Sequence, residues 1–204
     1  MVGTRCDGGD ERMKNNQRIV VIGASLGGLH ALRTLFAQLR ADFPHPIVVV
    51  QHRHKERSNL LLLALAENNS LPVVEITDKL ALQRGVVHLA PADYHVLVEQ
   101  QHLALSLEAP VIYARPSIDV LFESTALAYG SRTIGVVLTG ASHDGAAGIR
   151  AIKQRGGITL VQDPTTAECA IMPQAAIAAT TIDYVLSLDA IAATLANELH
   201  LTGR

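Results

Sequence analysis

Three residue types that together can perform hydrolysis each follow a separate apolar segment of this sequence. The pairs of segment and residue are Ile19–Ile22 with Ser25, Ile47–Gln51 with His52, and Thr133–Leu138 with Asp144. Because the carboxyl ends of parallel strands lie along one edge of a sheet, we expect the three side chains to meet there. A hydroxyl, an imidazole and a carboxylate gathered in this way are the components of a hydrolytic triad.

Each of the three residues has a distinct chemical task in this interpretation. The hydroxyl of Ser25 is a poor nucleophile until a base removes its proton. His52 can act as that base and then as an acid at neutral pH, because the pKa of imidazole is about 6.5. The carboxylate of Asp144 would fix the tautomer of the imidazole and stabilise its protonated form.

The segment around Ser25 has the form of a strand-to-helix elbow. A β-branched run enters Gly23, Ser25 follows, and Gly27-Gly28 open a helix. Backbone amides after Ser25, at the start of that helix, could hold an oxyanion. Glycine-rich turns of this kind also bind phosphates, so the segment alone is ambiguous.

Other interpretations remain open for these residues. Ser25 could be only a helix N-cap, His52 an exposed imidazole, and Asp144 a cap of the helix that begins near Gly145. His52, His54 and Asp144, with His143 as a fourth ligand, could instead bind a metal. No acidic cluster accompanies these histidines, so we expect no metal.

Cofactor binding is also not expected. A dinucleotide fold needs an acidic residue at the end of the second strand, where this chain has Gln51-His52-Arg53. Cys6 and Cys169 are too few for a disulfide framework, which favours a reduced, cytoplasmic setting. Neither cysteine follows a strand as Ser25 does.

Composition predicts one globular domain without a nucleic-acid or membrane partner. The 204 residues are 49% hydrophobic and 18% charged, with a formal net charge of −2 and no basic block. Residues 1–17 are polar and lack the apolar core of an export signal, and Leu60–Ala66 is too short to span a bilayer. We expect residues 1–17 to be a flexible leader and residues 18–204 a single domain.

Apolar strands alternate with segments of helical periodicity along the domain. This order predicts an α/β fold with a doubly wound, mainly parallel sheet. Tyr94–Val98 and Leu103–Leu107 alternate around a polar turn, which predicts an antiparallel hairpin. Ser117 and Ser187 are predicted N-caps. The alanine-rich stretch up to Ala179 is expected to be helical in part and broken by Pro173. We expect His88, His95 and His102 to be structural or exposed.

Several further motifs follow one another along the chain. They are Gly-Ala-Ser-Leu-Gly-Gly (23–28), Val-Gln-His (50–52), Leu-Ala-Pro (89–91), Arg-Pro-Ser-Ile-Asp-Val-Leu-Phe (115–122), Leu-Thr-Gly-Ala-Ser-His-Asp-Gly-Ala-Ala-Gly (138–148) and Gln-Asp-Pro-Thr-Thr-Ala-Glu-Cys-Ala-Ile-Met-Pro (162–173). In this order they resemble the catalytic domain of the chemotaxis protein-glutamate methylesterase family, CheB. The resemblance covers residues 18–195. It implies a parallel α/β sheet with an antiparallel hairpin, and it places the family's nucleophile on Ser25, its base on His52 and its aspartate on Asp144.

The resemblance also implies an activity and partners. The expected reaction is hydrolysis of glutamate γ-methyl esters on the cytoplasmic helices of chemoreceptors, with deamidation of receptor glutamines in many members. The chain carries Leu26 where the family usually has threonine and Ala141-Ser142 where it usually has Met-Gly, and Arg53-His54 replaces Met-Pro. These differences leave a second interpretation, a catalytically weak module that docks on receptors. We expect no receiver domain in this chain, so a separate receiver protein is a second candidate partner. Arg115 is expected either to border the active-site cleft or to be a solvated side chain.

Overall fold

The computed structural model describes residues 17–53, 59–67 and 69–197. The expected leader, apart from Gln17, and His54 lie outside the described residues. Within these ranges no helix is long and apolar enough to cross a membrane.

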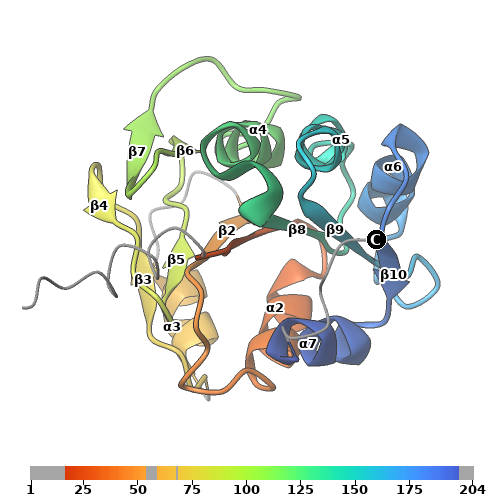
Figure 1. Cartoon of the computed structure of the whole chain (residues 1–204), viewed down its shortest axis with the longest axis horizontal. Coiled ribbons are helices and arrows are strands. Elements are labelled where there is room, and N and C mark those ends of the chain that lie inside the picture. The colour runs from red at the N-terminus through yellow and green to blue at the C-terminus, as the bar shows by residue number, and fades with distance from the viewer. Residues whose placement is uncertain (1–16, 54–58, 68, 198–204) are drawn as a thin grey trace, which may run out of the picture.

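A seven-stranded sheet forms the centre of the molecule (Figure 1). Its strands, in spatial order, are β10 (Tyr184–Leu186), β9 (Ile158–Gln162), β8 (Thr133–Val137), β1 (Ile19–Ala24), β2 (Ile47–Gln51), β5 (Val87–Leu89) and β3 (Val73–Glu75). Every pairing in this sheet is parallel. Strands β1, β2, β8 and β9 are buried along their whole length, as expected of apolar runs covered on both faces. The predicted doubly wound, mainly parallel sheet is confirmed.

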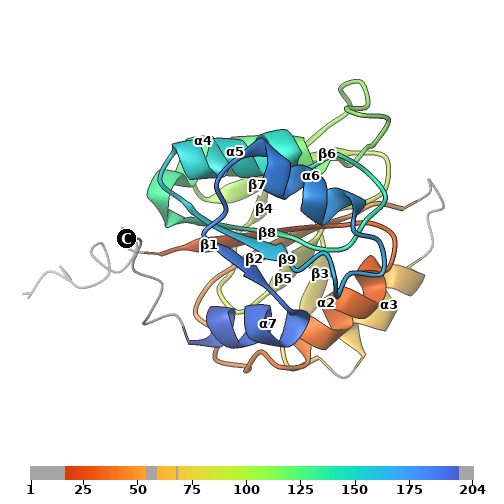
Figure 2. The same cartoon turned by 90° about the vertical axis from the view of Figure 1, so that its right-hand side faces the viewer.

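Helices cover both faces of this sheet (Figure 2). One face is covered by α4 (Ile118–Tyr129), α5 (Ala146–Gln154) and α6 (Ile171–Ala179), and the other by α2 (Gly28–Phe36), α3 (Leu60–Ala66) and α7 (Leu188–Ala196). A short 3-10 helix, η1 (Gly130–Arg132), joins α4 to β8. Each face has its own hydrophobic core, and alternate residues of β1 point into each.

A second, antiparallel sheet packs beside α4. Its order is β4 (Leu80–Ala81), β7 (His102–Ser106) and β6 (His95–Val98). The predicted hairpin is confirmed as β6 and β7. Strand β4 was not predicted, because its two residues are too few to show an alternation of apolar and polar side chains.

The predicted caps of two helices are confirmed, whereas the predicted break at Pro173 is wrong. Ser117 and Ser187 accept hydrogen bonds from the amides of Val120 and Ala190 at the starts of α4 and α7. Pro173 lies inside α6, in its first turn. The amides of a first turn have no partner within the helix, so a proline there removes no hydrogen bond.

Candidate functional site

The ends of the three central strands are tied together by backbone hydrogen bonds. Strand β1 lies between β2 and β8. The amide of Ser25 donates to the carbonyl of Thr139, which follows β8, at 3.0 Å. The amide of His52 donates to the carbonyl of Ala24 at 2.9 Å. The structure therefore brings the predicted residues to one sheet edge, at the switch point where doubly wound folds bind ligands.

Ser25 lies at a tight elbow between β1 and α2. Gly27 precedes the helix with φ of 77°, a left-handed conformation that favours glycine. Gly28 is needed for a close approach, because a Cβ there would lie 2.0 Å from Oε1 of Gln51. Nε2 of Gln51 donates to the carbonyl oxygens of Ser25 and His52, at 2.8 and 2.9 Å. One buried amide side chain thus fixes the backbone at both strand ends.

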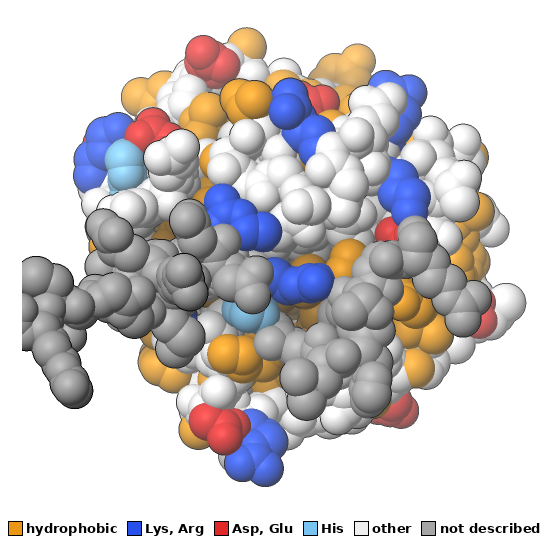
Figure 3. Space-filling model, viewed as in Figure 1, with side chains coloured by type: hydrophobic (Ala, Val, Ile, Leu, Met, Phe, Trp, Pro, Cys, Tyr) orange, Lys and Arg blue, Asp and Glu red, His pale blue; other side chains and the backbone are white. Residues whose placement is uncertain are grey.

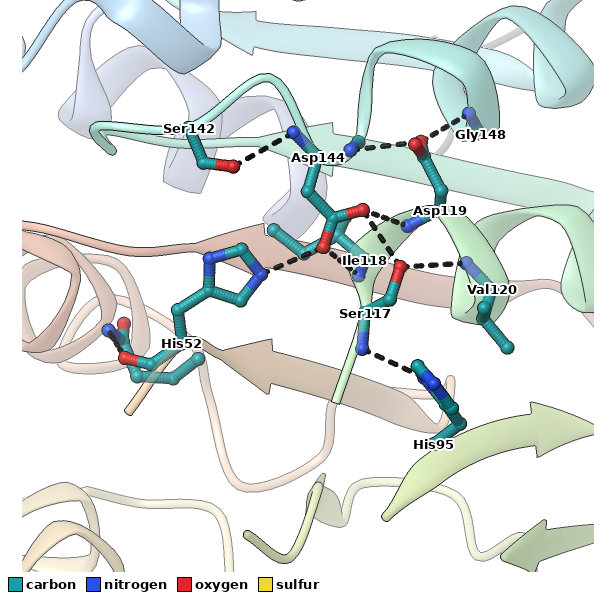
Figure 4. A network of polar contacts seen from close by, with 11 residues as sticks. His52, His95, Ser117, Ile118, Asp119, Val120, Ser142, Asp144 and Gly148 are labelled. Carbon is teal, nitrogen blue, oxygen red and sulfur yellow. Dashed lines mark hydrogen bonds and ion pairs between the residues drawn. The ribbon is translucent and has the colours of Figure 1, made fainter. Parts of the chain in front are cut away.

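His52 and Asp144 form a direct pair (Figure 4). Nε2 of His52 lies 2.8 Å from Oδ2 of Asp144, and the imidazole keeps 15% of its side-chain surface exposed while the carboxylate has none. An ionised carboxylate only accepts hydrogen bonds, so Nε2 carries the proton in this contact. Nδ1 is then the unprotonated nitrogen of the neutral ring.

Asp144 is held by the N-terminus of α4. Its Oδ1 accepts from Oγ of Ser117 at 2.8 Å and from the amide of Asp119 at 2.9 Å, and its Oδ2 accepts from the amide of Ile118 at 2.7 Å. The interpretation of Asp144 as a cap of the helix near Gly145 is therefore wrong, because its carboxylate caps α4 instead. Burial by itself would raise the pKa of Asp144. The bonds from His52 and the two amides outweigh burial, and they hold the pKa below its usual value.

Asp119 makes the reciprocal contact with α5. Its Oδ1 accepts from the amides of Gly145 and Gly148, at 2.9 and 2.7 Å. Burial, aided by the neighbouring charge of Asp144, raises the pKa of Asp119 to about 6, against the lowering effect of the two glycine amides. The carboxylate of Asp144, which precedes α5, therefore caps the N-terminus of α4, and the carboxylate of Asp119, in α4, caps the N-terminus of α5.

Three further residues of this network were not among the predicted site residues: Ser117, Asp119 and His95. Nδ1 of His95 accepts from the amide of Ser117 at 3.2 Å, and its Nε2 donates to the carbonyl of Ala109 at 3.1 Å. The sequence predicted Ser117 only as a cap and His95 only as structural or exposed. Nothing local indicated that both support Asp144 from a different part of the chain.

A cleft of about 1000 Å³ opens above these residues. Ser25, His52 and Arg53 are among its lining residues, whereas Asp144 is buried behind His52. Arg115 also lines the cleft, which confirms the expectation that it borders this cleft. The alternative, a solvated side chain, is wrong, because Arg115 pairs with Asp93 at 2.7 Å and is 17% exposed.

Of the other described histidines, His30 also lines the cleft, whereas His88, His95, His102 and His143 do not. Within the described ranges, no group of three His, Cys, Asp or Glu side chains is arranged to hold a metal ion. His143 is exposed and lies outside the cleft lining. His88 is buried, where Nδ1 donates to the carbonyl of Ile47 at 3.1 Å, and His102 pairs with Glu99. The expectation that His88, His95 and His102 are structural or exposed is confirmed.

Comparison with known proteins identifies relatives over most of the chain. The family model described as CheB methylesterase matches residues 20–195. A protein of Leptospira interrogans, whose name provisionally assigns protein-glutamate methylesterase and protein-glutamine glutaminase activity, is 43% identical over 178 residues, which are 87% of this chain and 92% of the relative. The protein-glutamate methylesterase/protein-glutamine glutaminase 1 of Carboxydothermus hydrogenoformans is 42% identical over 90% of this chain and 56% of its own length.

A solved structure has the same fold. The CheB methylesterase catalytic domain of Thermotoga maritima superposes with a TM-score of 0.86 at 34% identity, covering 90% of this chain and 98% of that domain. The resemblance predicted from the sequence motifs is confirmed by these findings.

Proposed function

The chain belongs to the CheB methylesterase family, and from this premise we propose that it hydrolyses glutamate γ-methyl esters on chemoreceptors, with Ser25, His52 and Asp144 as its catalytic triad. The relatives are also named as glutaminases, and deamidation of receptor glutamines would use the same acyl chemistry. None of these names supports the alternative of a catalytically weak docking module. The observation that carries the assignment is the His52–Asp144 pair, whose histidine lines the same cleft as Ser25 at the edge where three parallel strands end.

The proposed reaction proceeds through an acyl-enzyme. Oγ of Ser25 attacks the ester carbonyl as its proton passes to Nδ1 of His52, the ring nitrogen not engaged by Asp144. The tetrahedral intermediate collapses, and methoxide leaves as methanol with the proton from His52. Water activated by His52 then hydrolyses the acyl-enzyme, which releases the glutamate carboxylate and restores the Ser25 hydroxyl.

The protein supplies charge stabilisation at two places in this reaction. Asp144, kept ionised by its lowered pKa, stabilises His52 when the ring is positively charged. The amides that follow Ser25 at the start of α2 are proposed to hold the oxyanion. Losing one such donor typically costs about 3–4 kcal/mol of transition-state stabilisation. Gly28 is not available for this purpose, since its amide donates to the carbonyl of Ser25 at 2.9 Å.

The charge of the chain favours a protein partner over a nucleic acid. On the face in Figure 3, which lies at the amino ends of the strands and away from the cleft, acidic and basic side chains are scattered among apolar and polar ones. The formal net charge of −2 agrees with this distribution. Phosphate backbones are bound through gathered positive charge. We therefore propose methylated receptor helices as the substrate, with cytoplasmic location as part of the same proposal.

Replacement of the nucleophile tests this function. Ser25→Ala should remain folded, because the half-buried hydroxyl is removed without opening a core cavity, and it should release no methanol from methylated receptor membranes. A fluorophosphonate should label the parent chain and the control Ser131→Ala, an exposed serine in η1. It should not label Ser25→Ala. Methanol release by Ser25→Ala would contradict the assignment, and absence of labelling in the parent chain would favour a docking module.

A further inference from the structure

The connection between β7 and α4 carries a turn with an unusual backbone. Val111 and Ala114 exchange two backbone hydrogen bonds, of 3.1 and 2.8 Å, around Ile112 and Tyr113. Both central residues have positive φ, 46° and 62°. Two-residue turns of this form normally carry Asn-Gly, because positive φ is unfavourable for side chains with a Cβ. For a β-branched isoleucine it is a genuine outlier.

Burial does not compensate for this strain. Tyr113 is fully exposed, at 103% of its reference surface, and Ile112 is 47% exposed. Two large apolar side chains therefore occupy unfavourable conformations without packing in a core. Strain of this kind persists where the surrounding structure imposes it, and it concentrates at ligand-binding and catalytic sites.

The base of the connection is held rigidly. Nε and Nη2 of Arg115 donate to Oδ1 of Asp93, at 3.1 and 2.7 Å. Nη1 of the same guanidinium donates to the carbonyl oxygens of Leu107 and Glu108, both at 3.0 Å. In Figure 2 the segment between β7 and α4 projects beyond the layers, on the side where α2 begins. A braced base with an exposed apolar tip is suited to contact another molecule.

The turn shares its cleft with the catalytic residues. Ile112 and Tyr113 line the same cleft of about 1000 Å³ as Ser25 and His52. Exposed apolar side chains at the start of α2, Leu26 and Leu29, belong to this lining as well. A single ester side chain fills only a small part of such a volume. The remaining surface is available to the chain that carries the ester.

From this arrangement we propose that the Val111–Ala114 turn is a substrate-docking element, in which Tyr113 and Ile112 contact the apolar side of the helical protein segment that carries the methyl ester. The inference rests on the proposed function and adds the part of the enzyme that recognises protein substrate. The cleft supplies the apolar walls on which an amphipathic helix docks. A rigid aromatic side chain gives large contact area at low entropic cost.

Removal of the tyrosine ring tests the proposal with two substrates. Tyr113→Ala should lower kcat/KM for methylated receptor membranes about tenfold, mainly through KM, because only docking of the protein is lost. Its hydrolysis of p-nitrophenyl acetate, which reaches Ser25 without touching the turn, should stay within twofold of the parent rate. Leu127→Ala is the matched control, since Leu127 is 70% exposed on α4 and outside the cleft lining. This control should change neither rate.

Relief of the strain provides a second, independent measurement. The double replacement Ile112→Asn with Tyr113→Gly installs the residues that this turn normally takes. It should raise Tm by about 2–4 °C while lowering receptor hydrolysis as much as Tyr113→Ala does.

The possible outcomes distinguish failure of the docking element from failure of the proposed methylesterase function. Unchanged receptor hydrolysis by Tyr113→Ala, with both parent activities intact, would overturn the docking element alone and leave the turn to another partner. An equal loss on both substrates would also overturn it, because the turn would then support the catalytic residues. A Tm that does not rise in the double variant would refute the argument from strain. A parent chain inactive on receptors would overturn the proposed function and this inference together.

Discussion

Replacing Asp144 with asparagine removes one acceptor from a site with four donors. Oδ1 accepts from the hydroxyl of Ser117 and the amide of Asp119, and Oδ2 accepts from the amide of Ile118 and Nε2 of His52. Asparagine has a single oxygen, so its NH₂ group must face one of these two pairs. Each pair contains one backbone amide of α4. In either orientation, a buried amide loses its acceptor.

The magnitude of the loss follows from this count. A buried donor left without a partner costs about 1–3 kcal/mol, so the free energy of unfolding should fall by about that amount. Where the NH₂ faces His52, the ring can accept from it only by moving its proton from Nε2 to Nδ1. Nδ1 then cannot take the proton of Ser25, and kcat should fall about 10³–10⁴-fold, the effect of a wrong tautomer in a triad.

Methanol release from methylated receptor membranes measures kcat, and urea denaturation measures the free energy of unfolding. Asp42→Asn is the control, because Asp42 is exposed and pairs with Arg40, two residues before it. This variant should match the parent chain in both assays. If Asp144→Asn kept kcat within tenfold of the parent and unfolded at the same urea concentration, the assignment of four donors to this carboxylate would be wrong.

Two further replacements test the helix junction and the serine elbow. Asp119→Asn keeps an oxygen for Gly145 and Gly148 but cannot ionise. The pKa of Asp119 is about 6 in the folded chain and about 3.9 in the unfolded chain. Between these pH values the folded state binds more protons than the unfolded state. The parent chain therefore loses stability as the pH rises from about 4 to about 6. Between pH 4 and pH 7 the free energy of unfolding of the variant, measured by urea denaturation, should rise by about 2 kcal/mol relative to that of the parent. If the free energies of unfolding of the two proteins changed in parallel with pH, the prediction would be contradicted. Gly140→Ala places a Cβ 2.0 Å from Sδ of Met172 and 2.7 Å from Cβ of Ser25. It should cost about 1–3 kcal/mol of stability and lower kcat for methanol release, and a fully active, equally stable variant would refute the close packing.

Local patterns in the sequence were sufficient for every strand of the central sheet, though not for β4, and they were sufficient to choose the residues proposed as the triad. The continuous β-branched runs of β1, β2 and β8 predict buried parallel strands, because only such strands are apolar on both faces. Parallel strands share a carboxyl edge, so the residues that follow them, Ser25 and His52 among them, were expected together. The same local reasoning failed at Pro173, whose effect depends on its position within the helix turn.

The support of Asp144 was decided by tertiary structure. Its sequence position, directly before Gly145, left open the alternative of a cap for the helix that follows, whereas the folded chain directs its carboxylate to the amides of α4. The partners, Ile118 and Asp119, lie more than twenty residues away along the chain. Capping depends on which amides come within 3 Å of an oxygen, and helix packing alone sets that distance. The strained turn at Ile112 is similar, because composition predicts no positive φ for isoleucine and only the braced loop imposes it.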